Sequence, residues 1–120
     1  MLSDAARTAR AALVADRQLG GAQFGRALSD LIDDVLRSAL ADIVAGPSPW
    51  AVLGMGSYAR RELAPGSDVD VMLLHDGSRR GAPSADAAGA LWYPLWDAGF
   101  TLGQSVRSAK EAMADRKSVV

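Results

Sequence analysis

The stretch VLGMGSYARRELAPGSDVDVMLL, residues 52–74, decides the fold that this sequence predicts. Its first residues are apolar and lead into a Gly-Ser pair, and a second apolar run follows two aspartates. We therefore expect a strand, a Gly-Ser turn, a helical turn over 57–63, a Pro-Gly bend and a second strand. The nearly continuous apolar run over 71–74 is typical of a buried strand.

Asp68 and Asp70 stand at the start of that second strand. Side chains two residues apart on an extended segment point to the same face, so the two carboxylates should stand side by side. Like charges at that distance repel unless a cation neutralises them, which predicts a divalent-metal site. Two structural alternatives stay open: Asp68 could cap the preceding bend, and Asp70 could pair with Arg60 or Arg61.

The Gly-Ser turn is a candidate phosphate site. Gly56 lets the backbone approach a ligand closely, Ser57 offers a hydroxyl, and the helical turn offers free N–H groups. Arg60 and Arg61 add positive charge. A Gly-Ser pair alone is usually a simple turn, and the aspartates beyond the spacer 58–67 are what give it a functional interpretation.

This spacing is similar to the signature of the nucleotidyltransferase superfamily. Within that superfamily, GSYARRELAPGSDVDVMLLH at 56–75 resembles the amino-terminal catalytic segment of the protein-PII uridylyltransferases, the bifunctional uridylyltransferase/uridylyl-removing enzymes. A second block, LWYPLWDAGFTLGQSVRS at 91–108, is similar to a helix of the same family and the strand after it, which ends in S-V-R. Two blocks in the same order make the resemblance specific.

The resemblance implies an activity and a set of ligands. The activity is Mg²⁺-dependent transfer of UMP from UTP to a tyrosine of a PII signalling protein, with release of pyrophosphate. Asp68 and Asp70 would hold the metal and act as the catalytic carboxylates. ATP stays open as the donor, because no base-reading residue can be named. The candidate nucleotide contacts are Gly56, Ser57, Arg60, Ser67, Ser105 and Arg107.

The sequence also departs from the pattern it resembles. Ser57, Ala59 and Arg61 stand where the family often has glycine, and no acid after Val106 lies on an expected strand to supply a third carboxylate. The resembled enzymes are several times longer, so we expect an amino-terminal fragment. A non-catalytic chain that binds nucleotide and metal, or only a partner protein, is the alternative from another class. A nucleotidyltransferase acting on a small molecule is a third interpretation.

Residues 1–46 read as a helical leader to a core over 47–120. The first helix is expected over Ala5–Leu19, with Ser3 as its cap. The second has one apolar face from Phe24 to Ile43 and ends before Gly46 and the prolines that follow. Its charged residues should form a solvated face, and we expect packing but no chemistry from both helices. The charged residues are Asp30, Asp33, Asp34 and Arg37.

Beyond His75, which we expect at the surface, a polar loop carries Arg79 and Arg80. Ser84 or Asp86 should cap the next helix, a third strand is expected over 100–106, and a last helix over 109–117. The helix between carries three aromatics, which favour core packing over base stacking. They are Trp92, Tyr93 and Trp96. The fold class is therefore α/β (α+β), a nucleotidyltransferase fold with a small mixed sheet preceded by two helices.

Composition excludes several classes of binding partner and site. The formal net charge of −1 gives no basic field for non-specific nucleic-acid binding. The 120 residues include no cysteine, which excludes disulfides and thiolate metal sites. No apolar run approaches the roughly 18 residues that a membrane span needs. We therefore expect a cytoplasmic protein that binds neither nucleic acid nor membrane. The resemblance implies that its partners are a nucleoside triphosphate and a PII protein.

Overall fold

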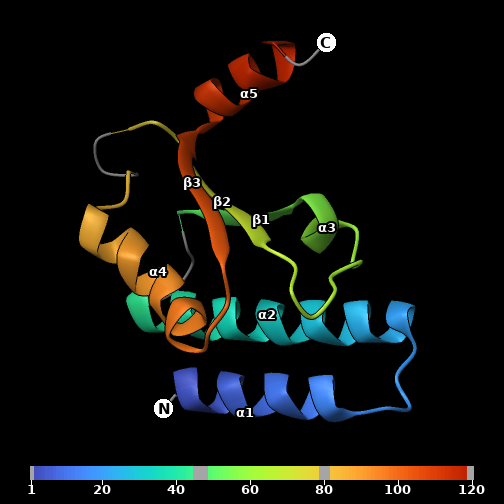
Figure 1. The fold of residues 1–120 in the computed structure, drawn as a ribbon. Coiled ribbons are helices and arrows are strands. Elements are labelled where there is room, and N and C mark those ends of the chain that lie inside the picture. The colour runs from blue at the N-terminus through green and yellow to red at the C-terminus, as the bar shows by residue number, and fades with distance from the viewer. Residues whose placement is uncertain (1, 45–48, 79–81, 119–120) are drawn as a thin grey trace.

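Two amino-terminal helices lie on one side of a small sheet, and the carboxy-terminal helix lies on the other side, at the end of the last strand (Figure 1). The computed structural model describes residues 2–44, 49–78 and 82–118. The helices are α1 (Leu2–Ala15), α2 (Gly21–Ile43), α3 (Gly56–Ala59), α4 (Ala85–Asp97) and α5 (Ala109–Ser118). The strands are β1 (Ala51–Met55), β2 (Val69–His75) and β3 (Leu102–Ser108). The predicted class, a small mixed sheet preceded by two helices, is confirmed.

The three strands lie in the order β1-β2-β3, with β1 antiparallel to β2 and β2 parallel to β3. Parallel neighbours need a long crossover, and α4 supplies it between β2 and β3. The short α3 and a turn connect the antiparallel pair. β2 is thus the central strand, and its residues have neighbours on both sides.

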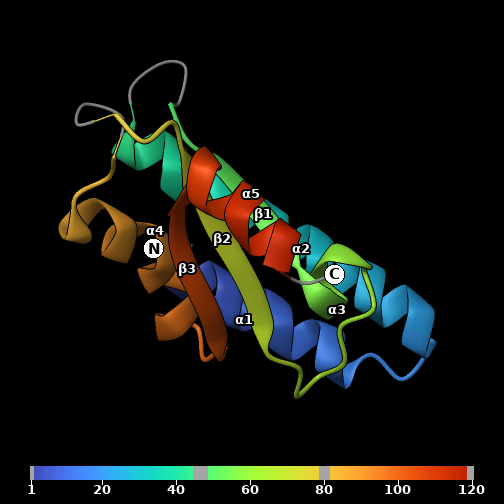
Figure 2. The ribbon, with the colours of Figure 1, turned by 90° about the horizontal axis from the view of Figure 1, so that it is seen from above.

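Only one face of β2 is buried. Val69, Val71 and Leu73 are at most 2% exposed, while Met72 and Leu74 on the other face are half-buried. The expectation of a strand buried throughout its apolar run is therefore wrong in the described part of the chain. Figure 2 looks onto the sheet from the side away from α1 and α2, which lie behind the strands.

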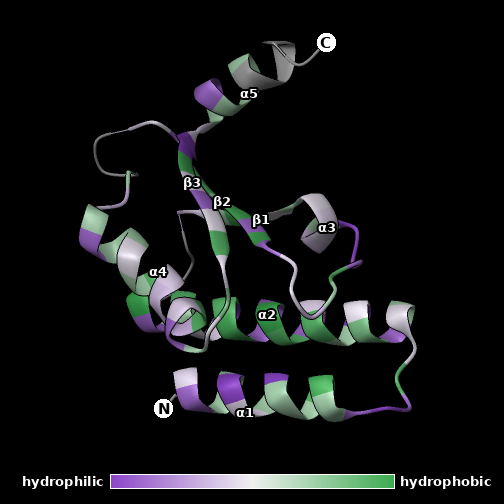
Figure 3. Ribbon diagram, viewed as in Figure 1, coloured by the Kyte–Doolittle hydropathy of each residue, from purple (hydrophilic) through white to green (hydrophobic). Residues whose placement is uncertain are grey.

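Helix α2 forms the floor beneath the buried face of the sheet. Its apolar positions recur at helical spacing and appear as hydrophobic patches along the ribbon in Figure 3. The predicted apolar face of the second helix is confirmed: its buried side chains join those of the sheet and α4 in one core cluster. The buried apolar residues of α2 are Phe24, Leu28, Ile32, Val35, Leu36 and Ala39.

The ends of the helical hairpin differ from the expectation. Helix α1 ends at Ala15 instead of Leu19, and Ser3 lies buried inside it, so Ser3 is not the cap. Gly20 is the N-cap of α2, and its N–H donates to Oε1 of Gln23 at 3.1 Å. The boundary near Gly46 lies outside the described residues. None of the described helices is both long and apolar enough to cross a membrane.

Helix α4 places one aromatic in the core and two outside it. Trp92 is 2% exposed, but Tyr93 and Trp96 are 59% and 42% exposed, so the expectation of core packing is confirmed for Trp92 and wrong for the other two. Ser84 caps the helix, because its Oγ accepts from the N–H of Ala87 at 3.1 Å. Gly99, with a φ of +97°, ends the segment in the left-handed conformation that glycine adopts readily.

The missing side chain of Gly25 lets the segment after α3 pack directly on α2. A Cβ at Gly25 would lie 2.7 Å from the carbonyl oxygen of Arg61 and 3.1 Å from that of Leu63. Both are backbone atoms, so the segment itself would have to move. Leu63, which follows, is only 2% exposed.

We predict that Gly25→Ala lowers the free energy of unfolding by about 1–3 kcal/mol through overpacking. This should happen although alanine favours a helix interior by about 1 kcal/mol over glycine. Gly89→Ala is the matched control, because a Cβ there meets no atom within 4 Å, and it should leave stability unchanged or raise it. Urea unfolding of both variants tests this, and a Gly25→Ala chain as stable as the parent would contradict it.

Candidate active site

Asp70 lies on the open face of the sheet, at the point where all three strands are present. It pairs with Met55 of β1 on one side and with Gly103 of β3 on the other. Its neighbours Val69 and Val71 point into the core, so the Asp70 side chain points to the opposite face, where it is exposed. A carboxylate here keeps its water, or a cation in place of water, without the cost of burial.

Two glycines flank the Asp70 carboxylate. A Cβ on Gly56 would lie 3.1 Å from Oδ2 of Asp70, and a Cβ on Gly103 would overlap Oδ1. Gly56 has a φ of +57°, a conformation that side chains disfavour, and directly follows β1. The structure thus brings Gly56 and Asp70 together as predicted. It adds Gly103, which was not predicted, although a glycine inside a strand often marks such a close approach.

Asp68 is exposed and immediately precedes β2. The N–H of Val69 donates to the carbonyl of Thr101 at 2.9 Å, so the extended pairing begins right after Asp68. The bend before it is closed by Ser67, whose Oγ accepts from the N–H of Ala64 at 2.9 Å. Ser67 therefore caps the bend, which was the structural alternative considered for Asp68. The nucleotide contact predicted for Ser67 stays a prediction.

The two arginines of the segment pair with acids other than Asp68 and Asp70. Arg60 Nε lies 3.1 Å from Oε2 of Glu62, and both side chains are more than 60% exposed. Arg61 points to α2 instead, so it does not add positive charge beside the Gly-Ser turn as expected. Within the part of the chain that the structure describes, neither arginine forms an ion pair with Asp70.

Four side chains form what we call the Arg61 cluster: Asp30, Asp33, Tyr58 and Arg61. Arg61 donates to Asp30 Oδ1 at 2.8 Å and to Asp33 Oδ2 and Oδ1 at 2.5 and 3.1 Å. The hydroxyl of Tyr58 donates to the same Asp33 carboxylate. The expectation of a solvated face is therefore wrong for Asp33, whose side chain is only 18% exposed. It is confirmed for Asp30, at 69%, and for Asp34 and Arg37, both at 76%.

The cluster holds Arg61 in an unusual backbone conformation. Its φ is +60°, which costs a residue with a side chain about 1–2 kcal/mol. That conformation also ends α3 at Ala59, well before the helical turn predicted through residue 63. Because the contacts join residues about 30 positions apart in sequence, local pattern could not reveal them.

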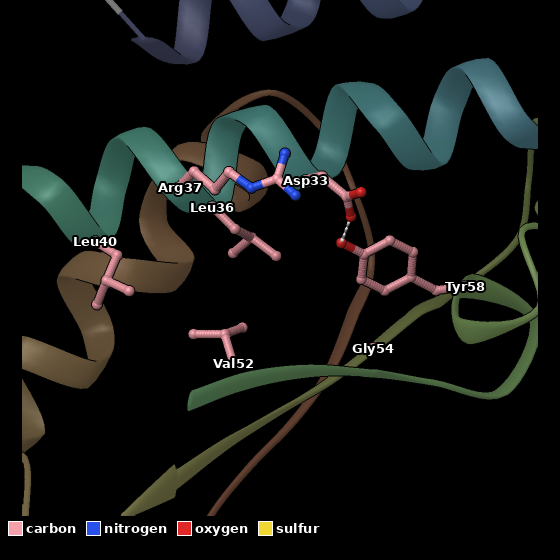
Figure 4. Close-up of a pocket in the computed structure, with 7 residues that line it drawn as sticks. All are labelled: Asp33, Leu36, Arg37, Leu40, Val52, Gly54 and Tyr58. Carbon is pink, nitrogen blue, oxygen red and sulfur yellow. Dashed lines mark hydrogen bonds between the residues drawn. The ribbon is translucent and has the colours of Figure 1, made fainter. Parts of the chain in front are cut away.

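A cavity of about 230 Å³ lies between α2 and β1, beside the Arg61 cluster (Figure 4). Val52 and Gly54 line it from the sheet, and they pair with the core-facing Leu73 and Val71 of β2. The cavity therefore opens on the opposite face of the sheet from Asp70. It is separate from the candidate active site.

Ser105 and Arg107 share the open face with Asp70, because they pair with Met72 and Leu74 of β2. At about 3.3 Å per residue, Ser105 lies about 7 Å along β3 from Gly103, and Arg107 about 13 Å. Their nucleotide contacts stay predictions. His75 ends β2, half-buried, and its Nδ1 accepts from the N–H of Gly77 at 3.0 Å. The loop arginines 79 and 80 lie outside the described residues.

Glu111 caps a helix and supplies no third carboxylate. Its Oε1 accepts from the N–H of Ser108 at 3.0 Å, and its own N–H donates to Ser108 Oγ at 3.1 Å. The hydrogen bonds from Ser108 lower the pKa of Glu111. Asp115 also lies in α5, as expected. Across the described ranges, no group of three or more potential metal ligands gathers.

A family model described as "Putative nucleotidyltransferase DUF294" matches residues 5–115. The chain belongs to this nucleotidyltransferase family. The match covers the helical hairpin and the sheet together. The matched residues include the Gly-Ser turn and the aspartate of the central strand.

Individual relatives carry a more specific name. The bifunctional uridylyltransferase/uridylyl-removing enzyme of Mycobacterium tuberculosis (strain CDC 1551 / Oshkosh) is 50% identical over 72 residues, 58% of this chain and 8% of that protein. The enzyme of that name from Streptomyces coelicolor is 38% identical over 104 residues, 87% of this chain and 12% of the relative. The enzyme of that name from Ectopseudomonas mendocina is 38% identical over 119 residues, which are 92% of this chain and 13% of the relative. The predicted resemblance is confirmed, and the chain spans 8–13% of these relatives.

Asp33 gives this nucleotidyltransferase domain a pH-dependent contact. Burial acts to raise the pKa of Asp33, but hydrogen bonds from Arg61 and Tyr58 outweigh it, and the pKa lies below the ordinary 3.8. A depressed carboxyl pKa adds stability above the unfolded pKa, and that stability is lost as the pH falls through the folded pKa. Burial and the bond to Asp33 also raise the pKa of the Tyr58 hydroxyl, so it stays protonated at neutral pH.

We predict that Asp33→Asn lowers the free energy of unfolding at pH 7 by about 1–3 kcal/mol, because charged hydrogen bonds are lost. The difference from the parent should begin to shrink as the pH falls below about 3.8, and the Asp33 contribution is lost as the pH falls through the lower pKa of the folded state. Urea unfolding at pH 7, 5 and 3 measures both effects. A difference that stays constant over this range would show that the Asp33 charge is not involved.

Proposed function

We propose that this chain carries the nucleotide- and metal-binding part of an enzyme that transfers UMP from UTP to a protein tyrosine. The observation that supports it most is the Asp70 carboxylate, which lies on the open sheet face between Gly56 and Gly103. Asp68 stands two residues before it, also exposed. The names of the relatives favour a uridylyl group, and the resemblance to PII uridylyltransferases suggests a PII protein as acceptor.

The donor set of this site fits Mg²⁺. This ion is usually bound through one or two carboxylates together with substrate phosphates and water, which matches Asp68 and Asp70 at an exposed face. The absence of side chains at Gly56 and Gly103 leaves room beside the Asp70 oxygens. When bound, Mg²⁺ would neutralise charge on the triphosphate and its leaving group.

The residues of this chain would hold the nucleotide for an in-line displacement. The acceptor hydroxyl would lose its proton to water as its oxygen bonds to the α-phosphorus, the bond from that phosphorus to the bridging oxygen would break, and pyrophosphate would leave. Gly56 and Ser57 would contact the β- and γ-phosphates through individual N–H groups and a hydroxyl. The helix dipole contributes little, because α3 is a single turn. Arg60, Ser67, Ser105 and Arg107 remain proposed secondary contacts.

A second candidate has support of its own. Glu111 is engaged as a helix cap, and no third carboxylate joins Asp68 and Asp70 within the described residues. The chain alone would then bind nucleotide and metal without turning over. ATP is the alternative donor for either candidate, because phosphate contacts do not distinguish the bases.

Calorimetric titration tests the proposal with UTP and ATP, each with Mg²⁺ or with a chelator. We predict binding that requires Mg²⁺ and is at least about tenfold weaker in Asp70→Asn, since that change removes a metal ligand. Gly103→Ala should also weaken binding, because its Cβ displaces the Asp70 carboxylate, a short side chain that can rotate without unfolding the strand. The better nucleotide identifies the donor.

Asp34→Asn is the matched control, because Asp34 is 76% exposed on α2 and its pair with Arg37 spans 3.6 Å. It should bind nucleotide like the parent. A folded parent chain that binds neither nucleotide would contradict the proposal. So would an Asp70→Asn chain with unchanged affinity.

A further inference from the structure

The Arg61 cluster is connected to the Gly-Ser turn by a continuous set of short contacts. The N–H of Glu62 donates to the carbonyl of Ser57 at 2.9 Å, and that of Arg61 to the carbonyl of Tyr58 at 3.0 Å. The N–H of Arg60 donates to the carbonyl of Gly56 at 3.2 Å. Residues 56–62 are thus a single hydrogen-bonded backbone segment, which we call the backbone unit 56–62. Gly56 lies at one end of this unit, and Arg61 of the cluster lies near the other end.

Helix α2 holds that unit at three places. The Tyr58 side chain is buried against the backbone of Gly54, and its hydroxyl donates to Asp33. Arg61 donates to both oxygens of the same carboxylate. The backbone of Gly25 approaches the backbone carbonyl of Arg61 closely. Because α2 contacts the unit at these places, a movement of α2 relative to the sheet would move Gly56 relative to Asp70.

Arg61 is the one residue other than glycine with a positive φ in the part of the chain that the structure describes. Nothing in its own side chain favours that conformation. Asp33 does, because its carboxylate, with a side chain only 18% exposed, accepts two hydrogen bonds from the guanidinium. The Asp30 side chain is 69% exposed, and an ion pair so open to solvent contributes little to stability.

We propose that Asp33, Tyr58 and Arg61 are positioning residues that hold Gly56 and Ser57 against Asp70 for nucleotide binding. They act through the backbone unit 56–62 and need not touch the nucleotide. This inference rests on the proposed function of the Asp70 site. It assigns α2, for which only packing was expected, a part in the geometry of that site.

The test compares Mg²⁺-dependent affinity for UTP in the parent chain of 120 residues and four variants, at a temperature where circular dichroism shows each one folded. Asp33→Asn and Arg61→Ala should bind about tenfold more weakly than the parent, a loss typical for residues that orient a binding group. Asp34→Asn, one position along the same helix, should stay within about twofold of it. If Asp33→Asn and Arg61→Ala bind like the parent, the proposal is wrong.

Arg61→Gly separates positioning from a simple gain in stability. Glycine enters the left-handed region without steric cost, so it should recover part of the affinity lost in Arg61→Ala while still lacking both ion pairs. A purely structural ion pair would give the two variants equal affinity. That equality would overturn the role of the conformation.

NMR spectra of the backbone amides of the same chains, recorded without ligand, distinguish the positioning role from the proposed nucleotide binding. Arg61→Ala should shift the amide resonances of Gly56 and Gly103, whereas Asp34→Asn should not. If the parent chain binds no nucleotide, the proposed function fails, and these spectra still decide the positioning role. Unchanged Gly56 and Gly103 resonances in a folded Arg61→Ala chain would refute it.

Discussion

The candidate site depends on the alternation of the central strand β2 between two environments. Val69, Val71 and Leu73 face a core made with α2 and α4, which fixes the register of the strand. A slip by one residue would bury Asp70 and expose those side chains. The hydrophobic core thus determines which face carries the Asp70 carboxylate. The same register sets Gly103 beside it, since β3 pairs in parallel with β2.

Helix α2 has a second role besides burying the sheet. Its apolar face packs under the strands, and the two acids next to that face, Asp30 and Asp33, bind Arg61 of the segment between β1 and β2. Arg61 adopts a conformation that glycine enters readily, with a φ of +60°, and its ion pairs offset the steric cost. A backbone conformation that a side chain disfavours is thus matched by partners on a distant helix.

Much of the fold could be predicted from periodicity. The apolar spacing of α2, the position of β2 and the crossover helix before β3 follow from local pattern. The association of the Gly-Ser turn with Asp70 was implied by the resemblance to the nucleotidyltransferase signature. Contacts between distant segments could not be predicted this way. Gly103 next to Asp70 depends on strand register, and the bond between Tyr58 and Asp33 depends on how α2 packs. The exposure of Trp96 likewise depends on which side of α4 meets the sheet.

We propose that metal and nucleotide bind on the open face, between Gly56, Asp70 and Gly103. Paramagnetic broadening tests this binding site directly, with Mn²⁺ in place of Mg²⁺, the nucleotide present and the chain labelled with ¹⁵N. We predict that the amides of these three residues broaden first, while those of Ala11 in α1 and Gly89 in α4 stay sharp. Broadening centred on Arg37 and Val52, at the cavity behind the sheet, would contradict it. So would the absence of any broadening in a folded chain.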